Sequence, residues 1–265
     1  MNAVQSMISA PVSRRSILKG VGVGAFGLTL AQAGFIRAAA AQSEELQDVL
    51  DILATTERFG VTFLGYGLES AAEGNFDTPW SETVTAIVTA ARAQEQFHLD
   101  AFEAAGGVPL VDTFTVPPEY LTEYDAFFGA VVEQEAAEIA ASIAAMRPFT
   151  ELGRPDLVKL VFQYGAEEAE HRLVANFTLG TRPANDFAFA PALFSTVQEF
   201  LESLEERGII GGNGTELVFP GPGKIDDTGV TEQEPGGELV DCAPSGTPTS
   251  NEGTPGSDEG TPDAS

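Results

Sequence analysis

The sequence predicts an all-α protein, and two observations support this fold class. From about residue 43 to residue 207, long segments with apolar residues at helical spacing alternate with short breaks that contain glycine or proline. No alternating apolar and polar run in this region is convincing as a strand. We expect a four-helix bundle with a long crossover between its second and third helices, then a short fifth helix and a disordered tail.

The first two helices are expected at about residues 43–72 and 79–105. The first contains a glutamate, Glu57, inside an apolar stripe formed by Leu50, Leu53, Val61, Leu64 and Leu68. Thr78 and Pro79 then supply an N-cap and a first helical residue. The second helix places Glu95 and His98 in line with its apolar residues, which are Val84, Ile87, Ala91 and Phe102.

Two further long helices and a short one follow. Residues 108–120 contain three prolines and no helical period, and they are long enough to cross the length of a bundle. The third helix, at about residues 121–146, has one face made of Phe128, Val131, Glu135, Ile139 and Ser142. The fourth begins at Pro155 and aligns Leu157, Val161, Tyr164, Glu168, His171 and Val174. The short helix, at about residues 194–207, ends before Gly208.

The first 41 residues predict an export signal. They contain no acidic residue, and Ser-Arg-Arg-Ser-Ile-Leu-Lys at residues 13–19 precedes an apolar, glycine-rich run. This pattern predicts a twin-arginine signal peptide over residues 1–41 and an extracytoplasmic protein, in the cell envelope or secreted, with no membrane attachment after cleavage. A membrane anchor is the alternative, but the run is short and rich in glycine for a spanning helix.

The composition of the remaining chain is strongly acidic, with a formal net charge of −27 for the whole sequence. Removal of residues 1–41 takes away four of the 13 basic residues and no acid, which leaves 40 acidic against 9 basic residues, or −31. This charge argues against nucleic acid as a partner. Lysine occurs only three times, and an acid-rich, lysine-poor surface suits concentrated salt, so we hypothesise a halophilic source.

The segment after the helices differs in composition from the domain at residues 43–207. Residues 208–265 are rich in Gly, Pro, Thr, Ser and acids, and we expect a largely disordered tail. The single cysteine, Cys242, lies in this segment and excludes both an internal disulfide framework and a four-cysteine metal site.

The two histidines carry the clearest functional signal. Each follows a glutamate by three residues, in Glu95-Gln-Phe-His98 and Glu168-Ala-Glu-His171, and these are the only histidines in the chain. Residues at positions i and i+3 lie on one face of a helix, so each pair can direct a carboxylate and an imidazole at one cation. Two such pairs, each joined by a glutamate from another helix, make up the ligand set of a dinuclear carboxylate site.

Two further glutamates complete this set. Glu57 lies 38 residues before Glu95 and Glu135 lies 33 residues before Glu168, so each half of the chain supplies one lone glutamate and one Glu/His pair. A lone glutamate on an apolar helix face more commonly extends to the edge of the stripe. Four buried glutamates need compensation, because each isolated buried charge destabilises the fold by several kcal/mol. Two divalent metal ions would cancel the total charge of −4. We choose Glu135 over Glu133 and Glu138 because its helical position places it on the apolar face of the third helix.

This pattern resembles the ferritin-like superfamily, with the two-histidine ligand set of bacterioferritin and rubrerythrin. The residues around Glu57, Ala-Thr-Thr-Glu-Arg-Phe-Gly-Val-Thr-Phe, are most similar to the exported ferritin-like proteins that include the desiccation-related group. The resemblance covers about residues 43–178. It implies that Glu95 and Glu168 bridge two metal ions, that Glu57 and Glu135 are terminal ligands, and that His98 and His171 each bind one ion.

The leading functional hypothesis is an exported dimetal-carboxylate oxidoreductase. Its cofactors would be two divalent metal ions, with iron as the first expectation and manganese as the alternative, since carboxylate and imidazole ligands suit both. It would reduce O2 or peroxide in a ferroxidase-like reaction or with another electron donor. The chain lacks the cysteines of a rubredoxin-like centre, which argues against a rubrerythrin-type peroxidase. The alternatives are a dimanganese catalase and a non-catalytic protein that binds metal or protects the envelope during desiccation or salt stress. A homo-oligomer is compatible with each of them.

Overall fold

The computed structural model describes residues 45–221, 225–231 and 235, and this part of the chain is mostly helical. The all-α class is therefore confirmed. The elements in chain order are α2 (Leu46–Glu73), α3 (Glu82–Ala104), β1 (Thr113–Val116), the 3-10 helix η1 (Pro118–Leu121), α4 (Tyr124–Glu151), α5 (Pro155–Thr178), α6 (Val197–Glu206) and β2 (Thr215–Val218). The predicted signal peptide at residues 1–41 lies outside the described residues.

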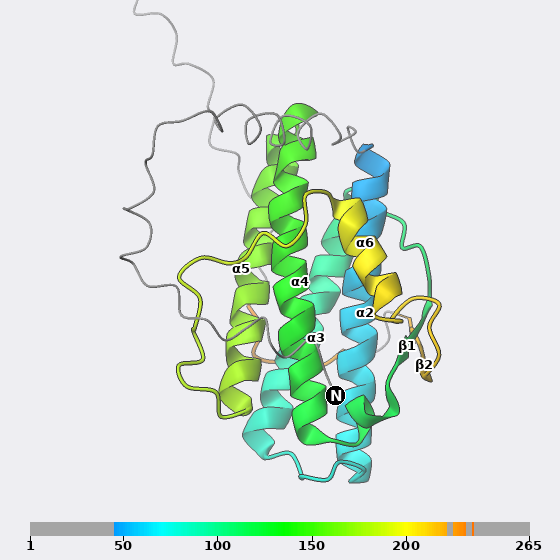
Figure 1. Cartoon of the computed structure of the whole chain (residues 1–265), viewed down its shortest axis with the longest axis vertical. Coiled ribbons are helices and arrows are strands. Elements are labelled where there is room, and N and C mark those ends of the chain that lie inside the picture. The colour runs from blue at the N-terminus through cyan, green and yellow to red at the C-terminus, as the bar shows by residue number, and fades with distance from the viewer. Residues whose placement is uncertain (1–44, 222–224, 232–234, 236–265) are drawn as a thin grey trace, which may run out of the picture. The chain divides into compact units, whose positions relative to one another are not determined.

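The long helices pack in two pairs around one apolar core (Figure 1). Helix α2 packs along α3, and α4 packs along α5, while α2 also contacts α4 and α3 contacts α5. The stripes of apolar residues expected from the helical period face this core, where Leu50, Leu53, Leu99, Phe102, Phe127 and Val161 are almost fully buried. Burial of one apolar face, more than helix propensity, holds such helices in place.

The start of α3 differs from the prediction. The helix begins at Glu82 and its N-cap is Ser81, whose hydroxyl accepts a hydrogen bond from the backbone N–H of Val84, rather than Thr78. Trp80 lies before the cap and packs against Phe127 at a ring-centroid distance of 5.1 Å. Since this contact fixes the backbone of residues 79–80 outside the helix, the first available capping side chain is Ser81.

Helix α4 also differs from the prediction at both ends. A 3-10 turn, η1, occupies the residues where the helix was expected to start, and the side chain of Asp77 accepts a hydrogen bond from Tyr124 N–H at the true first turn. At the other end α4 continues past Pro148 to Glu151. Proline removes one backbone hydrogen bond, but Phe149 is fully buried in the last turn, and this burial favours the longer helix.

The connection between α3 and α4 follows α2 from its first turns to its end. Near the start of α2, Asp51 accepts a hydrogen bond from Val108 N–H and Thr55 accepts one from Leu110 N–H. Near its end, the Ser70 hydroxyl donates to the carbonyl of Leu121. The connection thus contacts α2 near both of its ends.

A small sheet in this connection was not predicted. Strand β1 pairs with β2 antiparallel, with Thr113 opposite Val218 and Val116 opposite Thr215. Phe114 and Leu217 are fully buried beneath the sheet. Ordered structure therefore continues past residue 207, the expected end of the helical domain, because β2 covers apolar residues of the connection. Most of the predicted tail beyond this strand lies outside the described residues.

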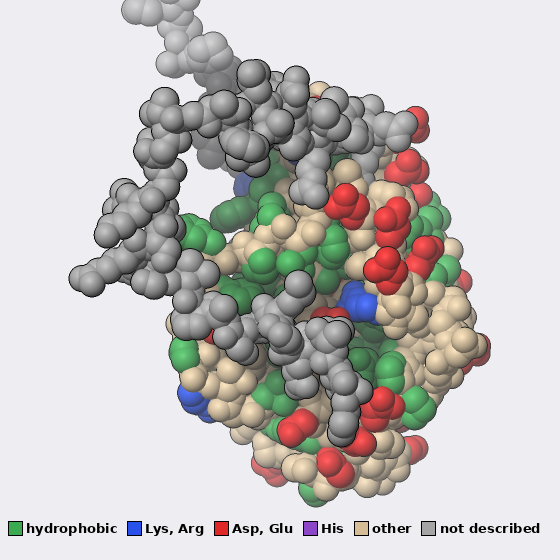
Figure 2. All heavy atoms as spheres, viewed as in Figure 1, with side chains coloured by type: hydrophobic (Ala, Val, Ile, Leu, Met, Phe, Trp, Pro, Cys, Tyr) green, Lys and Arg blue, Asp and Glu red, His purple; other side chains and the backbone are tan. Residues whose placement is uncertain are grey.

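The surface carries many more acidic than basic side chains. On the face drawn in Figure 2, acidic side chains gather around α6 and are spread below it, while basic side chains are sparse. Within the described residues, no helix is both long enough and apolar enough to cross a membrane.

Candidate metal centre

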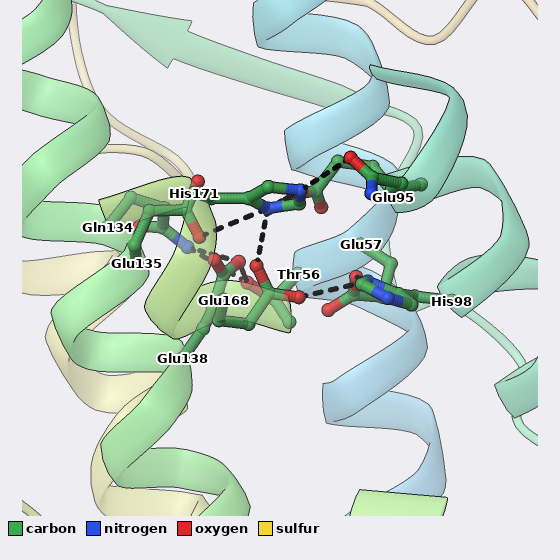
Figure 3. A network of polar contacts seen from close by, with 10 residues as sticks. Thr56, Glu57, Glu95, His98, Gln134, Glu135, Glu138, Glu168 and His171 are labelled. Carbon is green, nitrogen blue, oxygen red and sulfur yellow. Dashed lines mark hydrogen bonds and ion pairs between the residues drawn. The ribbon is translucent and has the colours of Figure 1, made fainter. Parts of the chain in front are cut away.

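The six predicted ligand residues come together between the four long helices (Figure 3). Glu57 comes from α2, Glu95 and His98 from α3, Glu135 from α4, and Glu168 and His171 from α5. The Glu/His pairs lie one helical turn apart on the inner faces of α3 and α5, as the i, i+3 spacing requires. Every helix of the core thus supplies at least one charged or titratable side chain to the same small volume.

The six side chains form two overlapping groups. One group contains Glu57, Glu95, His98 and Glu168, and the other contains Glu95, Glu135, Glu168 and His171. Within each group, one ligand atom per residue lies within 4.8 Å of the others. Glu95 and Glu168 belong to both groups, so a carboxylate of each faces both clusters. This is compatible with two metal ions that share these two carboxylates.

The carboxylates are buried, and several of their oxygens have no hydrogen-bond partner. Glu57 and Glu168 are fully inaccessible to solvent, and Glu95 is 1% exposed. Among the described residues, no hydrogen bond is made to either oxygen of Glu57, to Oε2 of Glu95 or Glu135, or to Oε1 of Glu168. Buried oxygens of this kind normally have partners. Converging unsatisfied carboxylate oxygens are the donor set that divalent cations accept, so these residues fit a metal site.

The pKa values of the carboxylates reflect the same crowding. Burial raises the pKa of Glu57 and Glu135 well above the usual value, and neighbouring carboxylates raise both further. Burial and the charge of Glu95 raise the pKa of Glu168 to about 8. Without a cation, part of this cluster therefore stays protonated at neutral pH, because a low-dielectric site disfavours several negative charges together.

The two histidines direct Nδ1 at the carboxylates. Nδ1 of His98 lies 2.9 Å from Glu168 Oε1 and 3.2 Å from Glu57 Oε2, but without the alignment of a hydrogen bond. Nδ1 of His171 lies 2.8 Å from Glu168 Oε2 and 3.2 Å from Glu95 Oε1. The rings are 6.2 Å apart, so one imidazole lies beside each group of carboxylates.

The protonation of the two imidazoles differs. Burial lowers the pKa of His98 to about 4, which leaves its ring neutral at pH 7 with a lone pair available to a cation. Burial alone would also lower the pKa of His171, but the charge of Glu168 and hydrogen bonds to surrounding carboxylates outweigh it and raise this pKa well above the usual value. Binding of a cation at His171 must therefore displace a proton.

Gln94 is a supporting residue that the sequence analysis missed. Its side-chain Oε1 lies 3.1 Å from Nε2 of His171. An Nε2–H that donates to this oxygen orients the ring and leaves Nδ1 to face the carboxylates, which is the usual arrangement around a ligand histidine. The sequence signal that could have identified Gln94 is its position immediately before Glu95, because residues next to a ligand on a helix flank the same site.

A second buried network lies behind the carboxylates. The hydroxyl of Thr56 and the amide of Gln134 both donate to Oε1 of Glu138, at 2.5 and 2.8 Å, and Gln134 also donates to Thr56. Arg207 donates to the Gln134 carbonyl oxygen from the other side. Glu138 is thus a fifth buried carboxylate near the centre, held by neutral donors rather than by a histidine. Burial and the charge of Glu135 raise its pKa well above the usual value.

Space for the centre depends on one glycine of α2. A Cβ at Gly60 would come within 2.2 Å of Glu95 Oε2, so only glycine leaves room for this carboxylate in its present position. Tyr164 lies beside His98, and its buried ring makes an edge contact with this imidazole at a centroid distance of 5.3 Å. Its hydroxyl has no hydrogen-bond partner among the described residues.

Comparisons with protein-family models, curated proteins and solved structures return no match to this chain. The assignment of the centre consequently depends on its own residues and geometry.

Proposed function

We propose that this chain is an exported ferritin-like protein that holds two divalent metal ions and uses them in redox chemistry with O2 or peroxide. The observation that carries the proposal is the pair of overlapping ligand groups that share Glu95 and Glu168. In this assignment Glu95 and Glu168 would be shared by the two ions, Glu57 and His98 would complete one site, and Glu135 and His171 would complete the other.

The order of the helices supports a ferritin-like four-helix bundle. The connection between α3 and α4 runs beside α2 from its start to its end, so α4 begins where α2 ends. Since α3 also begins near that end, α3 and α4 run in the same direction, and the connection is the long crossover of such a bundle (Figure 1). Each half then supplies one lone glutamate and one Glu/His pair.

The chemistry follows from the ligand types. Two adjacent redox-active ions supply two electrons together, and carboxylate with imidazole ligands suits iron or manganese. The residues of the chain hold the ions, release protons on loading and exclude bulk solvent. Four ligand glutamates match two divalent charges, which removes the energetic penalty of the buried carboxylates. Gln94 orients His171, and the ring of Tyr164 covers His98.

Metal analysis followed by single-turnover kinetics tests the proposal. Protein purified from its exported fraction is expected to contain about two metal ions per chain, and the Fe(II)-loaded protein to be oxidised by O2 or peroxide faster than free Fe(II). Oxygen release from peroxide without a reductant would instead indicate a dimanganese catalase. Two bound metals with no turnover would indicate structural metal binding or envelope protection, and fewer than one metal per chain would refute the dimetal assignment.

A further inference from the structure

A cavity of about 500 Å³ lies between α3 and α5, beside the candidate metal centre. Its walls come from α3, from α5 and from the segment after β2, which contributes Gly229, Val230, Thr231 and Pro235. His98 and Tyr164 form part of its lining, and 13% of the His98 side chain is exposed. The cavity therefore reaches a proposed metal ligand from the outside of the helices.

The lining is mainly apolar and aromatic. Four aromatic side chains contribute to it, namely Phe97, Phe102, Phe162 and Tyr164, together with Leu160, Val230 and three alanines. Phe162 is 66% exposed although it is a large apolar residue. Cavities of this size with apolar walls and a few polar groups are typical binding sites for small organic molecules. A site that admitted only Fe(II) or peroxide would not need walls of this kind.

The charges around the cavity limit the class of occupant. Glu167 is its acidic lining residue, and no lysine or arginine contributes to the lining among the described residues. The whole chain carries a formal net charge of −27. An anionic molecule such as a fatty acid would be repelled and would find no counter-ion among the described lining residues.

We infer that this cavity binds an uncharged apolar organic molecule, and that this molecule is the electron donor of the metal centre: it would lose two electrons and two protons, which reduce O2 to hydrogen peroxide or hydrogen peroxide to two molecules of water. The inference of binding depends only on the size and lining of the cavity. The inference of a reaction rests on the proposed function, because only a redox-active centre gives a molecule at His98 something to react with. The other neighbour of His98, the carboxylate cluster, is buried and offers no room for such a molecule.

Fluorescence of N-phenyl-1-naphthylamine, an uncharged dye, tests the binding site. The dye is expected to bind the full-length protein with one saturable site and to brighten on binding. Ala101→Trp and Ala90→Trp each place an indole in the cavity and should weaken binding at least about tenfold. Ala86→Trp is the matched control, because Ala86 is exposed on α3 and does not line the cavity, and it should bind the dye like the parent.

The anionic relative of this dye, 8-anilino-1-naphthalenesulfonate, tests the charge class. It has the same ring system with a sulfonate, and it should bind more weakly than the uncharged dye. Glu167→Gln should reduce this difference. Equal or tighter binding of the anionic dye would overturn the inference, as would unchanged binding of the uncharged dye in both folded cavity variants.

Metal content measured in the same samples separates the inference from the proposed function. Co(II) at the centre should quench the bound dye, because His98 belongs to both sites. Dye binding in a protein that takes up no metal would support the cavity and refute the dimetal proposal. Two bound metals without dye binding, or without quenching of bound dye, would refute the inference and leave the metal centre intact.

Discussion

His98 and His171 face the same shared carboxylate, Glu168, but they lie in different surroundings. His171 is 5% exposed at its side chain and is oriented by Gln94, whereas His98 is 13% exposed and forms a wall of the cavity. The two proposed metal sites therefore have the same types of ligand, but the site of His98 is more accessible from the cavity and from solvent than the site of His171. Loss of either imidazole should remove one ion rather than the fold.

We predict that His98→Ala and His171→Ala each lower metal content from about two ions per chain toward one and remove most redox turnover. One of four ligands is lost at one site, while the helical core is unchanged. Elemental analysis, circular dichroism and single-turnover oxidation measure the three properties. Glu133→Ala is the control, because Glu133 is exposed on α4 and should change none of them. Retention of two ions and full turnover in both histidine variants would refute the dinuclear assignment.

The buried carboxylates predict how stability depends on pH in the metal-free protein. A carboxyl whose pKa is raised by folding binds more protons in the folded state, so the free energy of unfolding falls as pH rises toward the folded-state pKa. For Glu168 this pKa is about 8, and those of Glu57, Glu135 and Glu138 are also raised. His98, with a pKa of about 4, has the opposite effect only below its usual value of 6.5.

Between pH 6.5 and 8, the chelated protein should therefore lose stability, and metal should restore it. Binding to the folded state adds about 2.7 kcal/mol when the free ion is at 100 times its dissociation constant. Urea unfolding across this pH range, with and without Mn(II), measures both effects, and Glu168→Gln should flatten the metal-free pH dependence. An unfolding free energy that is independent of pH and of verified metal removal would mean that these carboxylates do not interact.

At the scale of elements, close approach of α2 and α3 is what places Glu95. We predict that Gly60→Ala displaces this carboxylate and lowers metal content below one ion per chain, because its Cβ would overlap Glu95 Oε2. Gly67→Ala would instead contact Phe127, and should destabilise the core while it retains metal. Gly129→Ala meets no neighbour within 4 Å and should gain up to about 1 kcal/mol from helix propensity. Elemental analysis and thermal unfolding of the three variants separate these effects.

The helices and the six side chains that lie together between them could be predicted because both signals are local. A period of 3.6 residues locates each helix, and the spacing from Glu95 to His98 places both side chains on one face. The sheet could not be predicted in this way, since β1 and β2 are four residues each and pair across about 100 residues of sequence. Contacts across helices, such as Gln94 to His171 and Thr56 to Glu138, depend on how the helices are rotated and are equally non-local.

The sheet predicts where the chain can be shortened. A chain that ends at Gly221 retains β2, whereas a chain that ends at Arg207 loses it and exposes Phe114 and Val116. We expect the shorter chain to unfold at lower temperature by several degrees, since exposure of each large apolar side chain costs about 1.5 to 3 kcal/mol. Thermal unfolding of the two truncated chains makes the comparison. Equal melting temperatures would place the domain boundary at residue 207 as the sequence predicted.

At the scale of the whole molecule, acidic charges are present in two different environments. Those of the candidate metal centre are buried, where dissolved ions do not screen them and where bound protons or a bound cation compensate them. Those of the surface remain in solvent, and few of them have a basic partner: in the described residues, arginine ion pairs join Arg58, Arg147, Arg154 and Arg172 to nearby acids. Chelation and salt should therefore act independently on stability.

We predict that added KCl stabilises this protein by screening its surface. The Debye length falls from about 30 Å at 0.01 M to about 3 Å at 1 M ionic strength, which suppresses repulsion among the exposed acids. The melting temperature should rise by several degrees, with about 2 to 4 °C for each kcal/mol gained.

The triple variant Glu202→Lys, Glu205→Lys, Glu206→Lys changes exposed residues of α6 and brings the formal net charge from −27 to −21, so its melting temperature should depend less on salt. Metal content serves as the internal control and should be the same in both proteins. A melting temperature that is equal at low and molar KCl would refute surface repulsion as a determinant of stability, and with it the halophilic hypothesis.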